Sequence, residues 1–132
     1  MKALLSIKPE FVEKIFSREK LFEYRKAVFK RPDVKSVVIY STMPVGKIVG
    51  EFLVGDILAK SPEDLWEETK NDAGIDKQFF DSYFNNREIA YAIEIAELYQ
   101  YETPIDPYET DSSFTAPQSF KYLDYSSDLC LN

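Results

Sequence analysis

Hydrophobic and polar positions repeat with two periods along the chain, and the first 60 residues favour strands over helices. Four segments are rich in apolar, β-branched and aromatic residues and predict strands: 2–7, 21–29, 36–42 and 47–59. Gly50 and Gly55 interrupt the last of these, which predicts bulges or tight bends in a long strand. A helix is predicted over 9–17, because Pro9 suits a first helical turn and the apolar residues behind it share one face.

The second half begins with helix signals. Ser61 and Pro62 are typical of a helix start, and Asp76 is placed to cap a second helix. That helix carries an aromatic stripe, which we expect to lie in the core: Phe79, Phe80, Tyr83 and Phe84. Three further segments follow: a strand at 88–101, a loop at 103–117 and a short strand at 118–122.

This order of elements indicates an α+β fold. The middle strands are joined by short turns, which favours a mixed, curled sheet or a small barrel with helices at its edges over a doubly wound sheet. At 132 residues the chain is expected to form one domain over 1–123, followed by a polar, acidic tail at 124–132.

Composition supports a globular cytoplasmic protein. Hydrophobic residues make up 45% and aromatic residues 15% of the chain, and no apolar run is long enough to span a membrane. The first residues, MKALLSIKPE, become charged too early for a signal peptide. The single cysteine, Cys130, excludes an internal disulfide and suits a reducing compartment. The sequence does not indicate an oligomeric state.

The net charge of −7 conceals an uneven distribution. Residues 1–60 carry 12 Lys and Arg against 7 Asp and Glu, whereas residues 61–132 carry 4 against 16. An acidic total argues against a generic nucleic-acid coat, but a basic half can present a local anion-binding surface. Chance segregation of charge is the alternative interpretation.

Several familiar sites are excluded. The chain has no glycine-rich phosphate loop and no histidine, so a classical zinc site and a Ser-His-Asp triad cannot form. We therefore expect no metal and no cofactor, and any catalysis must use Lys, Asp or Glu, Tyr, or Ser or Thr side chains. The acidic residues between 106 and 111 are interpreted as a solvated loop.

The segment 17–26, SREKLFEYRK, is the strongest candidate site. On a strand, Glu23 and Arg25 would share one face, with Lys20 at the strand's entry. Two cations around one carboxylate can bind an anionic or amide-bearing ligand. A surface ion pair between strands is the alternative.

Residues 4–26, LLSIKPEFVEKIFSREKLFEYRK, resemble the signature of ASCH domains. That signature has a first strand, a Lys-Pro or Gln-Pro turn into a helix, and a Gly-x-Lys-x-x-Glu-x-Arg element, whose charged positions are matched by Lys20, Glu23 and Arg25. Arg18 stands where the family usually has glycine. Residues 37–52 resemble the family's following strands, and 116–123 resemble the closing strand of small microbial and phage members.

The resemblance implies a PUA-like small mixed β-barrel flanked by helices, with a cleft lined by the charged signature. It also implies binding of RNA or a nucleoside-like small molecule. Some small members resemble hydrolases: an amidohydrolase acting on N4-acetylcytidine and, in other relatives, a ribonuclease. The amidohydrolase group uses a Lys, a Thr and a Glu; Lys20 aligns with that lysine, whereas Glu23 stands at the position of the threonine.

The first functional hypothesis is a binding module for RNA or a nucleotide-like ligand. Three cations would contact phosphate or base edges: Lys8, Lys20 and Arg25. Glu23 would orient Arg25 or accept a hydrogen bond from an exocyclic amine. Tyr24 or Tyr40 would stack a base, with a place in the core as the alternative for each.

The second hypothesis is a small hydrolase. Lys20 would act as base or nucleophile, and Glu23 would carry a proton. Ser41 or Thr42 would bind the oxyanion or the leaving group, with strand-end hydrogen bonding as the alternative. A third hypothesis is a regulator that binds a protein partner through the acidic second half.

Overall fold

The structure, a computed structural model, describes residues 1–124. Its strands are β1 (Lys2–Ile7), β2 (Phe22–Arg25), β3 (Ser36–Ser41), β4 (Lys47–Lys60), β5 (Ala90–Ile105) and β6 (Phe120–Leu123). Its helices are α1 (Pro9–Phe16), α2 (Pro62–Thr69), the short 3₁₀ helix η1 (Lys70–Asp72), α3 (Lys77–Tyr83) and α4 (Pro107–Thr110). The predicted tail at 124–132 lies outside the described residues, apart from Asp124.

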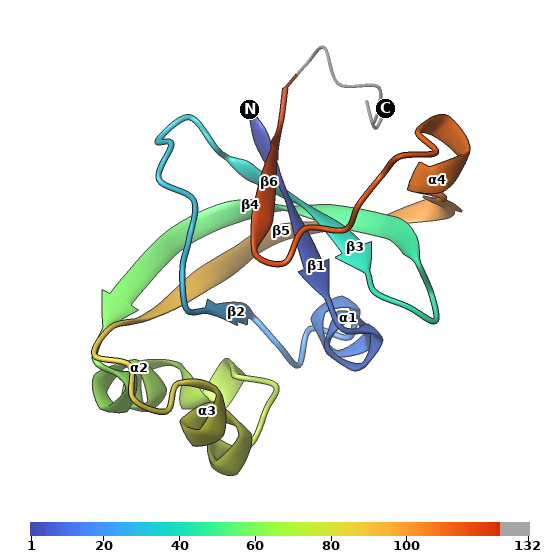
Figure 1. Cartoon of the computed structure of the whole chain (residues 1–132). Helices are drawn as coiled ribbons and strands as arrows, with labels where there is room; N and C mark the ends of the chain where they lie inside the picture. The colour runs from blue at the N-terminus through green and yellow to red at the C-terminus, as the bar shows by residue number, and fades with distance from the viewer. Residues whose placement is uncertain (125–132) are drawn as a thin grey trace.

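The six strands form one mixed sheet in the order β2-β5-β4-β3-β1-β6. β1 and β3 are parallel and the other neighbours are antiparallel. Figure 1 shows β4 and β5 as a long curved band, with α2 and α3 below one end, α1 beyond the end of β1 and α4 near the opposite end. No helix within residues 1–124 has the length and apolar character needed to cross a bilayer.

Helix starts follow the predicted capping residues. Ser61 accepts a hydrogen bond from the backbone N–H of Asp64, and Asp76 accepts one from Phe79. The loop predicted at 103–117 is partly wrong, because β5 extends to Ile105 and α4 follows it. Asp106 caps α4 by accepting a hydrogen bond from the backbone N–H of Tyr108, and a proline follows it in sequence, as one follows Ser61.

β2 is shorter than the strand predicted over 21–29. β2 and β5 are antiparallel, and Arg25 at the end of β2 lies opposite Tyr91, next to the first residue of β5, Ala90. Residues after this point in the chain therefore have no partner strand. Phe29 is nevertheless buried, because its ring packs edge-on against Phe120. The apolar residues after Arg25 therefore reach the core from a loop.

The bends predicted at the two strand glycines are confirmed. The pairing between β4 and β5 shifts register between Ile48 and Gly50 and again between Val54 and Ile57. Arg18, at the position where the resembled signature has glycine, has a φ of +67°. This left-handed conformation suits glycine and strains a residue with a Cβ atom.

The α+β fold is confirmed, but the small β-barrel that the resemblance implies is not closed. β2 and β6 are the edge strands of an open, curled sheet, and each has only four residues. The side chain of Arg25 bridges the opening, donating to the backbone oxygens of Ser6 and Ser119. The Arg25 side chain thus occupies the place where two strands would have to pair to close a barrel.

The two faces of the sheet have separate cores. Along β3, Val37 and Ile39 pack toward α1, whereas Val38 and Tyr40 pack on the opposite face with Phe114. A third core lies between β2, β5 and the helical segment from α2 to α3. This third core holds the helical segment against the sheet, beside the opening that Arg25 bridges.

Candidate functional site

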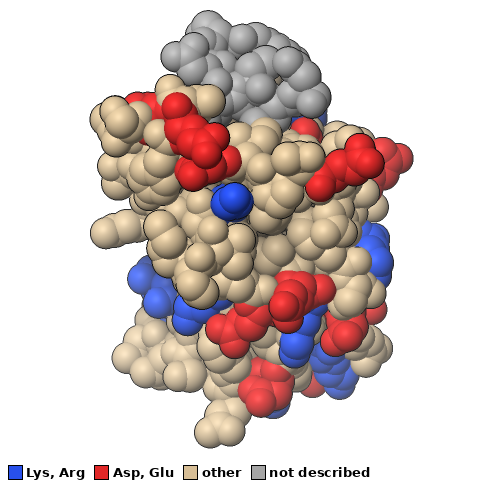
Figure 2. Space-filling model, turned by 90° about the vertical axis from the view of Figure 1, so that its right-hand side faces the viewer, with Lys and Arg blue, Asp and Glu red and all other residues tan. Residues whose placement is uncertain are grey.

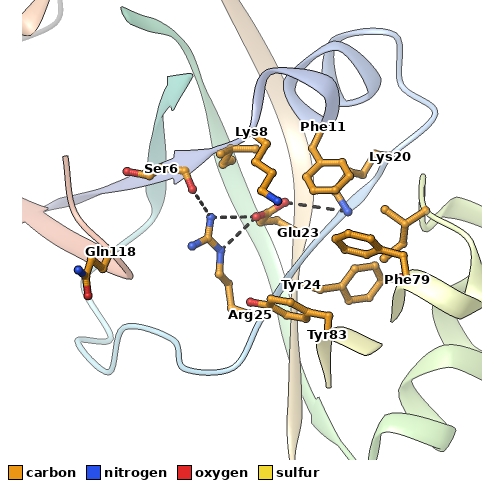
Figure 3. A pocket seen from close by; sticks show the side chains of 12 residues that line it. Ser6, Lys8, Phe11, Lys20, Glu23, Tyr24, Arg25, Phe79, Tyr83 and Gln118 are labelled. Carbon is orange, nitrogen blue, oxygen red and sulfur yellow. Dashed lines mark hydrogen bonds and ion pairs between the residues drawn. The ribbon is translucent and has the colours of Figure 1, made fainter. Parts of the chain in front are cut away.

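A pocket of about 240 Å³ opens where β1, β2 and α3 meet. Its twelve lining residues come from five parts of the chain: Ser6, Ile7, Lys8, Phe11, Lys20, Glu23, Tyr24, Arg25, Ile75, Phe79, Tyr83 and Gln118. Figure 3 shows charged side chains around Glu23 and aromatic rings toward α3. The pocket thus has a polar part and an apolar part.

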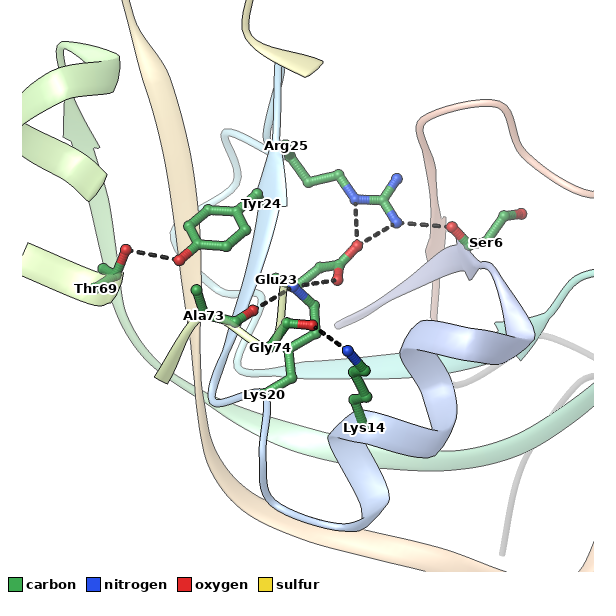
Figure 4. A network of polar contacts seen from close by, with 9 residues as sticks. All are labelled: Ser6, Lys14, Lys20, Glu23, Tyr24, Arg25, Thr69, Ala73 and Gly74. Atoms are coloured by element: carbon green, nitrogen blue, oxygen red, sulfur yellow. Dashed lines mark hydrogen bonds and ion pairs between the residues drawn. The ribbon is translucent and has the colours of Figure 1, made fainter. Parts of the chain in front are cut away.

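Glu23 is the centre of the polar part. Its carboxylate is 2.9 Å from Nη2 of Arg25, and Nε of Arg25 donates to the same oxygen at 3.1 Å. The other oxygen, Oε1, lies 4.0 Å from Nζ of Lys20. Alternation along β2 places Glu23 and Arg25 on one face, and Lys20 precedes the strand, so the three line one cavity. Figure 4 shows the polar contacts that Glu23 makes with Arg25 and Lys20.

Lys20 is a buried amine, with 2% of its surface exposed. Its Nζ donates to the backbone oxygen of Ala73 at 3.1 Å and lies 4.6 Å from the ring centre of Tyr24. Burial lowers the pKa of Lys20, and the attraction of Glu23 opposes this effect only in part. A lowered pKa makes the amine of Lys20 easier to deprotonate than that of an ordinary lysine.

Two lysines hold the loop before α3. Lys14 donates to the backbone oxygen of Gly74 at 3.1 Å, beside the bond from Lys20 to Ala73. Gly74 has a φ of +68°, and a Cβ atom there would lie 2.5 Å from the Cβ of Lys20. The close approach of this loop to Lys20 therefore requires glycine.

Tyr24 joins the pocket to the helical segment. Its hydroxyl lies 2.7 Å from Oγ1 of Thr69, and its ring makes an edge contact with Phe80 at 5.1 Å between centroids. Burial raises the pKa of Tyr24 to about 12 and also raises the pKa of Tyr83. Both hydroxyl groups therefore keep their protons to a higher pH than an ordinary tyrosine does.

Lys8 is the exposed cation of the pocket. It immediately precedes α1, where the positive end of the helix dipole adds to its charge, and it makes no ion pair within residues 1–124. Together with Lys20 and Arg25, Lys8 gives the pocket three cationic side chains, whereas Glu23 supplies its one carboxylate. The polar part of the pocket is thus suited to an anionic ligand.

Three of the predicted site residues lie outside the pocket. Tyr40 is buried on the opposite face of the sheet and packs against Phe114. Ser41 is buried in β3 opposite Ile7, and the backbone N–H of Thr42 donates to the oxygen of Ile7. The predicted residues that line the pocket are Lys8, Lys20, Glu23, Tyr24 and Arg25.

Sequence reasoning missed the residues that complete the pocket: Ser6, Ile7, Phe11, Ile75, Phe79, Tyr83 and Gln118. The spacing of the aromatic stripe contained a usable signal. Phe80 and Phe84 point into the core, whereas Phe79 and Tyr83 lie one position earlier in each turn and line the pocket. No comparable signal marks Ser6, whose backbone oxygen is the group that binds Arg25.

The pocket brings together the buried amine of Lys20, a carboxylate and an exposed cation. Within residues 1–124, no three metal-ligating side chains lie close enough together to hold a metal ion. The groups present can move protons and stabilise negative charge on an oxyanion.

Comparison with known proteins adds several relatives. The chain is 30% identical over 91% of its length to ATP synthase subunit alpha of Ureaplasma parvum, and 29% identical over 68% to the large ribosomal subunit protein uL22 of that organism. It spans only 15% and 29% of the lengths of these two proteins. It is 28% identical to an ASCH domain-containing ribonuclease of Zymomonas mobilis, over 92% of this chain and 83% of that protein.

The fold has a close match among solved structures. The crystal structure of ASCH from Zymomonas mobilis superposes with a TM-score of 0.85 and 27% identity, covering 94% of this chain and 88% of that one. The sequence profile of the ASCH domain matches residues 5–99, which include the end of β1, all of α1 and all the charged residues of the pocket. The chain therefore belongs to the ASCH domain family.

Proposed function

We propose that this protein binds RNA at the pocket around Glu23. The observation that carries the proposal is the convergence of Lys8, Lys20 and Arg25 on one cavity of about 240 Å³. Phosphate groups bind cationic side chains, and a cavity of this size suits one nucleotide unit rather than a duplex. Membership of the ASCH family and a relative named a ribonuclease support an RNA ligand.

The acidic second half gives less support to a protein-partner function. Figure 2 shows one face of the molecule, on which Asp and Glu side chains form several separate groups instead of one continuous acidic surface. The pocket, in contrast, holds three cationic side chains against the single carboxylate of Glu23. RNA is therefore the ligand that the arrangement of charge favours.

Binding is tested with a labelled RNA oligonucleotide in a salt titration. Affinity should fall as salt rises, because RNA binding releases counterions. Lys8→Ala should weaken binding and reduce the slope of log affinity against log salt by about 1. The matched control is Lys47→Ala, since Lys47 is an exposed lysine outside the pocket. Equal effects of the two substitutions would contradict the proposed site.

A second candidate function is cleavage of the bound RNA. The specific observation is the amine of Lys20, whose pKa is lowered by burial and which lies 4.0 Å from a carboxylate oxygen. The deprotonated form of Lys20 would take the proton of a ribose 2′-hydroxyl, the 2′-oxygen would bond to phosphorus, and the bond from phosphorus to the 5′-oxygen would break. The proton on Lys20 is then available for the leaving 5′-oxygen, and Lys8 would stabilise the charge on phosphate.

Cleavage is tested by gel analysis of end-labelled RNA. Lys20→Met should abolish cleavage, and Lys20→Arg should abolish cleavage while retaining binding, because guanidinium keeps its charge and does not act as a base. Lys14→Met is the matched control, since Lys14 binds the neighbouring carbonyl of the same loop but does not line the pocket. Cleavage by Lys20→Met at the wild-type rate would eliminate this function and leave the binding proposal standing.

A further inference from the structure

The loop between β2 and β3, residues 26–35, is rich in positive charge. Its sequence is KAVFKRPDVK, and all four of its cationic residues are exposed: Lys26, Lys30, Arg31 and Lys35. Its one acidic residue, Asp33, is bound by Arg31, whose Nη2 lies 2.8 Å from Oδ2 of Asp33. With four cations against one carboxylate, the loop carries a net charge of +3 in a chain whose net charge is −7.

Apolar residues of the loop hold it against the sheet. Phe29 and Val34 are buried in the core that faces α1, and the ring of Phe29 makes an edge contact with Phe120 of β6. The backbone N–H of Lys30 donates to the hydroxyl of Tyr122 at 3.2 Å. Figure 1 shows the loop leaving β2 and passing beside β6 before it enters β3. Because the apolar residues point inward, the cationic side chains lie on the outside.

The loop begins at the rim of the pocket. Lys26 directly follows Arg25, and its Nζ lies 4.8 Å from the ring centre of Tyr83, which lines the pocket. Arg25 donates to the backbone oxygen of Ser119, just before β6, and the loop meets the same strand again at Tyr122. A series of exposed cations therefore leads outward from the pocket along β6.

The loop lysines differ in their partners from other lysines of the chain. Three lysines around α2 and α3 each form an ion pair with a nearby carboxylate: Lys60, Lys70 and Lys77. Within residues 1–124, no carboxylate pairs with any of the three loop lysines. Like charges on one loop repel one another, and a bound polyanion relieves this repulsion. The charge of the loop is thus available to a ligand outside the protein.

We propose that the loop of residues 26–35 binds the phosphate backbone of RNA outside the pocket, through Lys26, Lys30 and Lys35. The inference rests on the proposed RNA-binding function and extends the binding site beyond a cavity that suits one nucleotide unit. Lysine amines bind phosphate without reading the base, so the loop adds affinity and not sequence preference. An RNA long enough to reach the loop should therefore bind more tightly than one that fills the pocket alone.

The test compares a labelled RNA dinucleotide with a labelled RNA octanucleotide in a salt titration. The octanucleotide should bind the wild type more tightly. Substituting both Lys30→Ala and Lys35→Ala should weaken octanucleotide binding and reduce the slope of log affinity against log salt by about 2, while dinucleotide binding stays unchanged. Lys26→Ala should reduce the octanucleotide slope by about 1. Alanine keeps the backbone N–H that binds Tyr122, so the anchor of the loop is retained.

The matched control carries Lys60→Ala and Lys70→Ala, which change the net charge by the same amount but lie outside the loop and the pocket. Circular dichroism and thermal unfolding establish that each variant is folded. Equal losses in the two double variants would overturn the loop site, because net charge alone would then explain them. An equal loss on both RNA lengths would overturn it as well.

The pocket and the loop are separated by one further comparison. If the loop variant binds the octanucleotide as tightly as wild type while Lys8→Ala weakens binding, the loop site is wrong and the pocket proposal stands. If the wild type binds neither RNA at low salt, the proposed function is wrong, and the loop site is wrong with it.

Discussion

Nη2 of Arg25 donates to the backbone oxygen of Ser6 at 2.7 Å, and this bond joins β2 to the end of β1 across the open side of the sheet. The same guanidinium donates to the oxygen of Ser119 at 3.3 Å and pairs with Glu23. One side chain therefore spans the opening and also fixes the carboxylate at the centre of the pocket. This double role makes Arg25 the most sensitive of the charged pocket residues to substitution.

Replacing Arg25 with alanine should lower the free energy of unfolding by about 3 kcal/mol, because Glu23 would be left as a buried carboxylate without its closest partner. Urea unfolding measures the loss. Arg31→Ala is a matched control, since Arg31 also pairs with a carboxylate two residues away, in Asp33, but on the surface. Its loss should be much smaller. Similar losses for the two variants would show that Arg25 does not brace the opening.

Lys20 should make stability depend on pH. Its pKa is lowered from 10.5 by burial, with Arg25 and Lys14 adding to the effect and Glu23 opposing it. Between the lowered pKa and 10.5, the folded protein binds fewer protons at Lys20 than the unfolded chain does. The free energy of unfolding contributed by this residue therefore rises with pH through that window, and is lost as pH falls through the lowered pKa.

Unfolding of the wild type, Lys20→Met and Lys20→Arg at a series of pH values checks this sign. Neither variant titrates at position 20 in this range, so the wild type should gain stability relative to both as pH rises toward 10. The raised pKa values of Tyr24 and Tyr83 act in all three proteins and cancel in the comparison. Parallel curves for the three proteins would refute the assignment.

Gly74→Ala should destabilise the protein more than Gly46→Ala, by roughly 1 to 3 kcal/mol. Both glycines have positive φ, at +68° and +63°, so the backbone strain of alanine is similar. The added methyl group at 74 would meet the Cβ of Lys20 at 2.5 Å, whereas at 46 it would meet the mobile end of the exposed Met43 side chain at 2.9 Å. Equal midpoints in chemical unfolding would contradict this difference.

Arg18→Gly should stabilise the protein by about 0.5 to 1 kcal/mol, because glycine adopts a positive φ without strain. The Arg18 side chain is exposed, so little contact is lost. Asn86, with a φ of +63°, supplies the comparison. Asn86→Gly should give a smaller gain, since asparagine tolerates this conformation better than arginine. A thermal unfolding midpoint below wild type for Arg18→Gly would count against the strain.

The elements that could be predicted from the sequence are those with local signals. Ser61 and Asp76 cap helices through their own side chains, and Gly50 and Gly55 mark register shifts because a missing side chain weakens regular pairing. The strand at 21–29 was predicted too long because its end depends on where β5 begins, about 65 residues later in the chain. Local propensity does not contain that information.

For the pocket, too, local features could be predicted from the sequence and long-range ones could not. The spacing of Lys20, Glu23 and Arg25 predicted one shared cavity, because alternation along a strand is a local rule. The sequence left a curled sheet and a small barrel as alternatives, and the choice between them was not predictable, since Arg25 reaches backbone oxygens, which no residue type reveals. Which aromatic residues of α3 face the pocket depends on how the helix docks against Tyr24, a long-range contact.

The loop before α3 is held by lysine amines on two consecutive backbone carbonyls, those of Ala73 and Gly74. The anchoring atoms on the loop side therefore belong to the main chain, and the side chains at 75, 79 and 83 take no part in these two bonds. Related proteins could exchange these three residues during divergence without loosening the loop. For protein engineering, they form a small set of positions at which ligand preference can be redesigned while the backbone of the loop stays in place.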